Sequence, residues 1–261
     1  MDLALNGKLA LVTGASSGLG AACATALAAE GVRVIVNARD KKRLSAAADT
    51  IEAACGTRPQ MVVGDIATDK GLAAIEKAVA RLPVDILVSN GGGPPAGQFL
   101  DHDAETWEGA GKLVLESAAA LTRMVLPGMI KRAWGRLIYI SSVGVLQPVD
   151  DLVLSNAYRA AVTGMCKTIS NNYAHHRITA NCVCPGYTAT ERLVSLATTR
   201  AHSSGKTRED VMDEFARMIP AARVGRPEEL GALVAFLASD RAAYITGASI
   251  PVDGGLHRSL L

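Results

Sequence analysis

Short apolar runs alternate with longer alanine-rich segments along the whole chain. The apolar runs predict strands at residues 9–13, 33–38, 61–64, 85–89, 136–141, 178–184 and 248–252. The segments between them show helical periodicity near residues 18–30, 40–55, 68–81, 104–133, 154–175 and 227–238. Strands that are apolar on both faces and separated by helices indicate a parallel sheet covered on both sides. We therefore expect a doubly wound α/β fold of about seven strands, with its ligand crevice at their carboxyl ends.

One segment, from Thr188 to Asp210, breaks this alternation. It is polar, with "TTRAHSSGKTRED" at its centre. A connection of this length is usually either disordered or a functional lid. A lid is favoured because the segment follows directly on the end of a strand. The chain shows neither a linker nor an internal repeat, so we expect one domain over residues 1–261 with a substrate-lid insertion near 188–218.

Composition narrows the possible partners. The chain has 261 residues, 49% of them hydrophobic, which is ample for a large core. Its net charge of +2 gives no reason to expect nucleic acid or an anionic membrane as a partner. The apolar runs are too short and interrupted to predict a membrane span. The five histidines lack ligand spacing, so no metal site is expected. Five cysteines without a C-x-x-C pair or a signal-peptide pattern predict a cytoplasmic protein.

The stretch "TGASSGLG" follows the first predicted strand and opens the first predicted helix. In such a turn Gly14 permits the tight bend, Gly18 lets a pyrophosphate approach the backbone, and Gly20 lets the helix pack closely on the strand. The helix that begins here offers free N–H groups to a phosphate. A glycine cluster of this kind could also be an ordinary turn, but its position between strand and helix favours a dinucleotide.

With this motif the chain resembles the short-chain dehydrogenase/reductase family, in particular members like the 3-oxoacyl-ACP reductases. The resemblance extends over essentially the whole length, through "GDI" (64–66), "SNGG" (89–92), "PGYTAT" (185–190) and "ITGASIPVDGG" (245–255). It implies a single Rossmann-type NAD(P)-binding domain and assembly into a homotetramer or homodimer. The cofactor contacts that it implies are Thr13, Gly14, Ser16, Ser17, Gly18, Leu19, Gly20, Arg39, Asp65, Ile66, Asn90, Gly91, Arg159, Pro185, Gly186, Thr188 and Thr190.

The end of the second predicted strand distinguishes the two nicotinamide cofactors. An acidic residue there would bind the ribose 2′-hydroxyl of NAD, whereas a basic residue accepts the 2′-phosphate of NADP. Here the acidic position holds Ala38, and Arg39 follows it. A guanidinium suits phosphate geometry. NADP(H) is therefore expected ahead of NAD(H), although Arg39 could simply open the following helix.

The family's catalytic residues are a tyrosine, a lysine four residues later, a serine and an asparagine. Ser142 fits the serine. The family's usual separation then places Ser155 at the tyrosine position and Arg159 at the lysine position. The anchors "W" at 107 and "P" at 127 place Val114 at the asparagine position. Three of the four groups are thus replaced, although Arg159 could still hold the nicotinamide ribose.

The missing tyrosine leaves the proton donor open. Ser155 is a much weaker acid than a phenol and is too short to replace it. Arg159 does not release its proton readily. Tyr158 could lean toward the crevice, or it could pack against a neighbouring chain. Tyr187 could donate from the opposite wall, or it could only line the pocket.

Two functions from different classes remain. The first is a divergent NADP(H)-dependent reductase of a ketone or acyl-type carbonyl, or a dehydrogenase of the corresponding alcohol, with Tyr158, Tyr187 or water as proton donor. The second is a catalytically inactive NADP(H)-binding protein, a sensor or an assembly subunit. The loop "GGGPPAGQF" (91–99) is either a fixed wall of the pocket or a backbone surface for a flat or acyl substrate.

Overall fold

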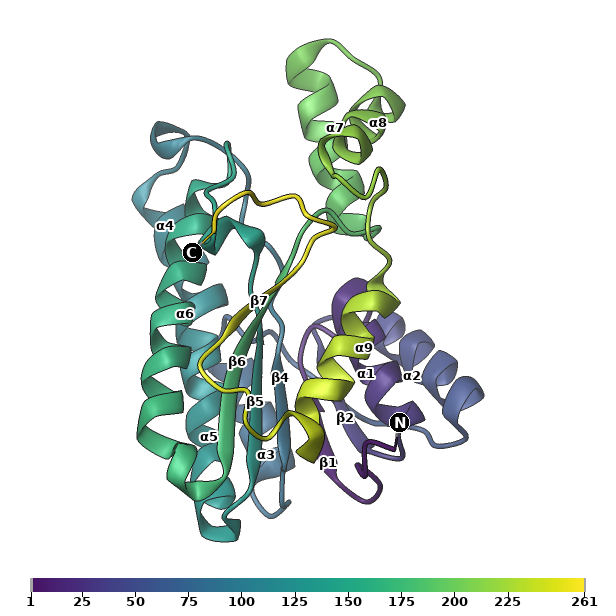
Figure 1. The fold of residues 1–261 in the computed structure, drawn as a ribbon, viewed down its shortest axis with the longest axis vertical. Helices are drawn as coiled ribbons and strands as arrows, with labels where there is room; N and C mark the ends of the chain where they lie inside the picture. Colours follow the sequence, from purple (N-terminus) through teal and green to yellow (C-terminus); the bar gives the residue numbers. More distant parts are fainter. Residues whose placement is uncertain (1, 261) are drawn as a thin grey trace.

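A parallel sheet with strand order β3-β2-β1-β4-β5-β6-β7 organises the computed structural model, which describes residues 2–260 (Figure 1). The order reverses between β1 and β4, and a reversal of this kind opens a crevice at the carboxyl ends of the strands. The doubly wound fold class is confirmed. The strands are β1 (Leu9–Val12), β2 (Arg33–Ala38), β3 (Gln60–Val63), β4 (Ile86–Ser89), β5 (Gly135–Ile140), β6 (Ile178–Pro185) and β7 (Ser249–Val252).

Helices cover both faces of the sheet, and the strands are apolar on both sides for that reason. Val12 and Val88 face one hydrophobic core, while their neighbours Leu11 and Leu87 face the other. The first face carries α1 (Gly18–Ala29), α2 (Lys41–Cys55) and α9 (Pro227–Ala238). The second carries α3 (Asp69–Val79), α4 (Ala104–Gly111), α5 (Ser117–Arg132) and α6 (Val153–Tyr173). Short 3₁₀ turns occur at Phe99–Asp101, Val143–Val145, Ala174–His176 and Asp240–Ala242.

A π-helical turn, Lys112–Glu116, joins α4 to α5 without a break. The resulting continuous helix, Ala104–Arg132, is the one helix within residues 2–260 that is long enough and apolar enough to cross a membrane, judged by length and composition alone. A helix was predicted near residues 104–133, but no stretch was expected to be long and apolar enough for a membrane span. Leu121, Val125 and Met129 of this stretch are buried in the second core. Packing against β4 and β5 therefore accounts for its apolar character.

The segment expected to form a lid consists of two helices, α7 (Glu191–Ser204) and α8 (Arg208–Met218), which we call the lid. They project beyond the carboxyl ends of the strands (Figure 1). Leu193, Val211 and Phe215 form a small hydrophobic core of their own between the two helices. The sequence analysis expected no helices here because the segment is polar.

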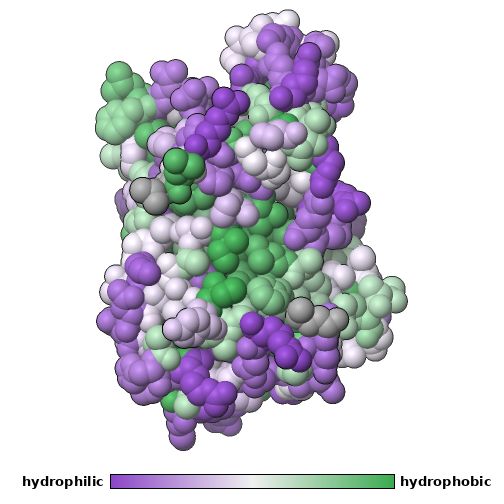
Figure 2. Space-filling view, viewed as in Figure 1, coloured by the Kyte–Doolittle hydropathy of each residue, from purple (hydrophilic) through white to green (hydrophobic). Residues whose placement is uncertain are grey.

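An apolar surface lies where the sheet ends at β7 (Figure 2). Beyond β7 no further described strand pairs with the sheet. Ile245, Ile250 and Val252 are only partly buried there, packed on the first core. An unpaired edge with apolar side chains is a surface suited to contact with another protein.

Candidate active site

A cavity of about 540 Å³ opens at the carboxyl ends of the strands, where the fold predicts it. Two of the predicted cofactor residues, Thr13 and Gly20, do not line the cavity themselves but lie behind the residues that do. The predicted residues that line the cavity are Gly14, Ser16, Ser17, Gly18, Leu19, Arg39, Asp65, Ile66, Asn90, Gly91, Ser142, Ser155, Arg159, Pro185, Gly186, Thr188 and Thr190. The fold therefore brings together segments that lie far apart in the sequence.

The glycine turn after β1 is built so closely that side chains do not fit. Gly14 has a φ of +60°, and a Cβ there would lie 2.6 Å from the carbonyl oxygen of Asn90. A Cβ on Gly20 would lie 2.2 Å from the carbonyl oxygen of Gly14. Gly20 thus serves close packing of helix on turn, as the sequence predicts.

Asn90 holds this turn from the end of β4. Its backbone N–H donates to the Thr13 hydroxyl at 3.0 Å, and that hydroxyl in turn donates to the Asn90 carbonyl at 3.0 Å. The Asn90 amide nitrogen donates to the carbonyl of Gly14 at 3.3 Å. Thr13 is fully buried, so its role is to support the turn rather than to touch a ligand.

The N-terminus of α1 opens into the cavity without a side-chain cap. Ser17 occupies the cap position in an extended conformation but forms no capping hydrogen bond, and no acidic residue lies in the first turn. The first N–H groups of the helix are therefore free to bind an anion, and the helix dipole favours negative charge there. This donor set fits the pyrophosphate of a dinucleotide.

Two arginines lie at the end of the cavity next to β2. Arg39 is largely exposed and lies 3.7 Å from the carboxylate of Asp65. Arg43, on the first turn of α2, donates to the Ser17 hydroxyl at 3.2 Å and pairs with Glu191 of the lid at 2.5 Å. The sequence analysis missed Arg43. The run of basic residues at 41–43 was a signal, but only the fold shows which side chain reaches the glycine turn.

Ser155 and Arg159 face the opposite end of the cavity from adjacent turns of α6. The Nε of Arg159 donates to the Ser155 hydroxyl at 3.2 Å, and its Nη1 donates to the carbonyl of Ile140 at 2.7 Å. Both side chains are buried. Burial, and second the charge of Arg192, lowers the pKa of Arg159 to about 10, so it stays positive at neutral pH.

Ser142 lies beside this pair, directly after β5. Its hydroxyl oxygen accepts a hydrogen bond from the backbone N–H of Gly144 at 3.0 Å. The hydroxyl proton is not used in that bond and can point into the cavity. Ser142 can therefore donate to a ligand oxygen, as the family resemblance implies.

Val114 lies in the π-helical turn, behind Arg159. It lines a small void of about 20 Å³ together with Ser141 and Tyr139. The Ser141 hydroxyl has no hydrogen-bond partner among the described residues. The valine side chain adds no polar group to this void.

The structure corrects the expectation for Tyr158. Its hydroxyl donates to the backbone carbonyl of Trp107 at 2.9 Å, and its ring packs against the Trp107 ring with centroids 5.8 Å apart. Tyr158 belongs to the second core and does not line the cavity. Three residues after Ser155 on the helix, it points toward α4. The position of Tyr158 contradicts its prediction as a catalytic proton donor, and the ring packs on Trp107 of the same chain rather than on a neighbouring chain.

Tyr187 lines the cavity from the loop after β6. Its ring stacks on Phe215 of the lid, with centroids 4.3 Å apart. Burial raises the pKa of its hydroxyl, which makes it a weaker acid. In the same loop Thr190 caps α7 by accepting the N–H of Leu193 at 3.4 Å.

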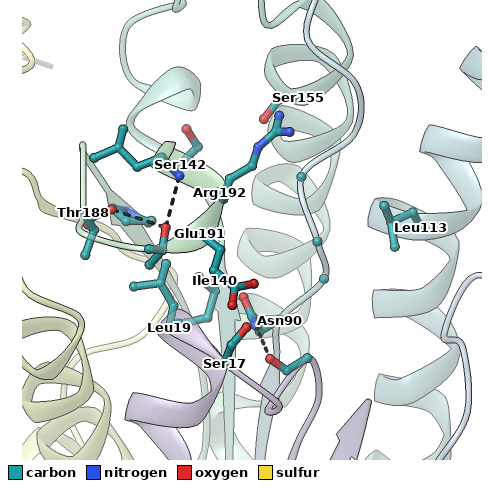
Figure 3. A pocket seen from close by; sticks show the side chains of 18 of the residues that line it. Ser17, Leu19, Asn90, Leu113, Ile140, Ser142, Ser155, Thr188, Glu191 and Arg192 are labelled. Carbon is teal, nitrogen blue, oxygen red and sulfur yellow. Dashed lines mark hydrogen bonds between the residues drawn. The ribbon is translucent and has the colours of Figure 1, made fainter. Parts of the chain in front are cut away.

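Arg192, on the first turn of α7, is a second residue that the sequence analysis missed. Its guanidinium enters the cavity on the side where Ser155 is drawn, away from Ser17 (Figure 3), and both Arg192 and Ser155 line the cavity. The Nη2 donates to the carbonyl of Pro94 at 2.7 Å. A Cβ on Gly93 would lie 2.7 Å from the Arg192 Nε. The glycine- and proline-rich loop (91–99) thus holds the Arg192 side chain in position.

Comparison with known proteins identifies the family. The sequence model of a family described as enoyl-(acyl carrier protein) reductase matches residues 14–257. Nodulation protein G of Azospirillum brasilense is 34% identical over 252 residues, covering 96% of this chain and 98% of that protein. The 3-oxoacyl-[acyl-carrier-protein] reductase of Aquifex aeolicus is 32% identical over 259 residues, covering 98% of this chain and 100% of that protein.

A solved structure agrees with these sequence relatives. L-sorbose reductase of Gluconobacter frateurii, complexed with NADPH and L-sorbose, aligns with a TM-score of 0.93 and 32% identity, covering 100% of both chains. The present chain belongs to the short-chain dehydrogenase/reductase family. The resemblance drawn from its motifs is confirmed.

Proposed function

We propose that this family member is an NADP(H)-dependent reductase of ketone or acyl-type carbonyls that works without the family's tyrosine. The observation that carries the proposal is a cavity with two distinct ends. One end offers the uncapped N-terminus of α1 together with Arg39 and Arg43. The other offers a serine hydroxyl and a buried cation. The NADPH named for L-sorbose reductase supports the choice of cofactor.

The residues divide the work between binding and charge stabilisation. The N-terminus of α1 binds the pyrophosphate, and Arg39 and Arg43 bind the 2′-phosphate by charge-assisted hydrogen bonds. Bound NADPH supplies the hydride. Ser142 donates a hydrogen bond to the carbonyl oxygen of the substrate. Arg159 stabilises the negative charge that develops on that oxygen.

The proton that completes the alcohol comes from Tyr187 or from water. Tyr187 lines the cavity, whereas Tyr158 is held by Trp107. Arg159 keeps its own proton at neutral pH because its pKa is about 10. A donor weaker than the family's tyrosine lowers turnover but leaves hydride transfer possible.

The cofactor assignment is tested by fluorescence titration of the purified protein with NADPH and with NADH. We expect NADPH to bind at least about tenfold more tightly. Arg39→Gln with Arg43→Gln should abolish that preference. Arg33→Gln is the matched control, because Arg33 is exposed at the opposite end of β2. Equal affinity of the wild type for the two cofactors would refute NADP(H) specificity.

Turnover is tested next, by following NADPH oxidation over a panel of ketones and oxo acids. Ser142→Ala should lower the rate by about tenfold or more, because it removes the donor to the substrate oxygen. Tyr187→Phe separates the two proton sources: a large loss identifies the phenol, and an unchanged rate identifies water.

A second candidate function is a catalytically inactive NADP(H)-binding protein. The replacement of the family's tyrosine and lysine by Ser155 and Arg159 favours it. Tight NADPH binding without turnover of any panel member, or of the corresponding alcohols with NADP⁺, would support this function and contradict the reductase.

Assembly into a homo-oligomer, a tetramer or a dimer, is part of the proposal. The unpaired edge of β7 and the apolar surface beside it support it (Figure 2). Light scattering of the purified protein tests it, and a monomer at micromolar concentration would contradict it. A cytoplasmic location stays a prediction.

A further inference from the structure

Two guanidinium groups meet at the substrate end of the cavity. Arg159 enters from α6, and Arg192 enters from the first turn of α7. Arg159 donates to the carbonyl of Ile140 and to Ser155, and Arg192 donates to the carbonyl of Pro94. All of these acceptors are uncharged. Among residues 2–260, no carboxylate forms an ion pair with either arginine.

The carboxylates that line the same cavity are engaged elsewhere. Asp65 faces Arg39, and Glu191 pairs with Arg43. Asp40 caps α2 by accepting the N–H of Arg43 at 2.9 Å. The carboxylates at the β2 end are therefore matched by nearby arginines, whereas the positive charge at the substrate end has no matching carboxylate. Buried charges are normally paired, so a negatively charged ligand group would complete this end of the cavity.

The Arg192 side chain is held in place rather than free in solvent. Its Nη2 donates a hydrogen bond to the backbone carbonyl of Pro94, and the lack of a side chain at Gly93 leaves room for its Nε. Burial lowers the pKa of Arg192, and the two arginines repel each other, which lowers the pKa of Arg159 further. A negatively charged ligand relieves both effects.

Apolar side chains also line the cavity, namely those of Val149, Leu152 and Leu196, together with the ring of Tyr187. Leu196 lies one turn after Arg192 on α7, and Leu152 lies three residues before Ser155. A ligand that satisfies both features carries a carboxylate on a short apolar body. Planar guanidinium groups bind planar carboxylates through paired hydrogen bonds.

We propose that Arg192 and Arg159 form an anion subsite that binds the carboxylate of the substrate, so that the substrate is a short apolar oxo acid or the corresponding hydroxy acid. The reduction of the oxo group of this acid rests on the proposed function. The binding of its carboxylate does not. The phosphates of the cofactor do not need this subsite. The N-terminus of α1 serves the pyrophosphate at the opposite end (Figure 3), and Arg39 and Arg43 serve the 2′-phosphate.

Isothermal titration calorimetry of the protein saturated with NADP⁺ tests the subsite. The probes are isovalerate and its uncharged isostere isovaleramide. We expect isovalerate to bind at least about tenfold more tightly than the amide. Arg192→Gln should abolish that preference and leave the affinity for NADP⁺ within about twofold. Arg192→Lys should retain part of the preference because it keeps the charge without the planar fork.

Arg217→Gln is the matched control, since Arg217 is an exposed arginine on α8 of the same lid. It removes the same charge from the lid without touching the cavity, and it should change neither affinity. Circular dichroism confirms that each variant is folded. If Arg217→Gln lowers the affinity for isovalerate as much as Arg192→Gln does, the effect is long-range attraction and the subsite is refuted.

Three further results overturn the proposal. These are equal affinity for acid and amide, no binding of either probe, or an Arg192→Gln variant whose affinity falls for NADP⁺ and not for isovalerate. A titration with NADP⁺ alone tests the cofactor assignment separately. If NADP⁺ does not bind, the cofactor assignment is wrong, and the acid and the amide are then compared on the cofactor-free protein.

Discussion

The two ends of the cavity bind by different means. Around the N-terminus of α1 the wall is mostly backbone, shaped by glycines whose Cβ positions are already filled by neighbouring atoms. Around α6 the wall is made of side chains, among them Ser142, Ser155 and Arg159. A wall made of backbone tolerates few substitutions. Side chains at the other end can be exchanged while the fold stays intact, and that is where the family resemblance implies replaced residues.

The largest effect is expected from a single methyl group in the backbone end. Gly20→Ala places a Cβ against the carbonyl of Gly14, so the turn must move. We expect the affinity for NADPH to fall by about 100-fold and the free energy of unfolding to fall by about 1–3 kcal/mol. Fluorescence titration and urea unfolding measure the two losses.

The matched control for this prediction is Gly164→Ala in the middle of α6. A Cβ at that position meets nothing within 4 Å. The control should raise the free energy of unfolding by about 0.5–1 kcal/mol because alanine favours helix. If Gly20→Ala binds NADPH as the wild type does, the backbone end is not rigid and the comparison between the two ends fails.

The second prediction places a tyrosine and a lysine in the side-chain end, at the positions where the family resemblance implies them. Ser155→Tyr combined with Arg159→Lys adds a phenol with a nearby ammonium group to the cavity. Turnover of an uncharged ketone should rise by about 100-fold, the effect of a general acid. Steady-state NADPH oxidation measures it. Ser155→Phe with Arg159→Lys adds similar bulk without the hydroxyl and should give no increase. No gain from the tyrosine would mean that Val114 also limits the reaction.

The third prediction concerns pH and the charge of Arg159. The cation is present below its pKa of about 10 and is lost as pH rises through that value. Affinity for isovalerate should therefore be constant between about pH 6 and 9 and fall up to about tenfold per pH unit beyond about 10. Tyr187 remains neutral over the lower range because burial raises its pKa. Calorimetry across this range measures the profile, and a loss of affinity below pH 8 would contradict the role of Arg159.

The smallest effect is expected from Tyr158, which the fold removes from the cavity. Tyr158→Phe loses the hydrogen bond to Trp107 but keeps the ring packing. The free energy of unfolding should fall by about 1 kcal/mol, as for a typical hydrogen bond. Turnover and NADPH affinity should not change. A loss of turnover with the stability intact would return Tyr158 to the list of proton donors.

The sheet and the helices that flank it could be predicted because their signal is local. Buried strands such as residues 9–12 are continuous apolar runs, and helices such as α2 show one apolar stripe. The lid helices also carry apolar stripes, with Leu193, Ala197 and Ala201 on α7 and with Val211 and Phe215 on α8. The polar residues around these stripes led to the expectation of a loop. Their caps were a usable signal, since Thr207 and Asp210 form a capping box at the start of α8.

The cavity residues divide in the same way. The glycine turn was predictable because its spacing states a backbone requirement. The direction of Tyr158 was not, since it depends on Trp107, which lies 51 residues earlier in the chain. Arg43 and Arg192 were missed because a long side chain can point in many directions. The fold brings hydrogen-bond acceptors such as Ser17 and Pro94 close to these arginines, and the acceptors fix the direction of each side chain.

The ion pair between Arg43 and Glu191 has a kinetic consequence. It joins α2 to the first turn of the lid at the mouth of the cavity, and both of its side chains are well exposed. An exposed pair of this kind contributes at most about 1 kcal/mol. Opening it would slow the exchange of a dinucleotide by less than about tenfold. The pair can therefore open and close at the mouth of the cavity without holding a bound dinucleotide there for long.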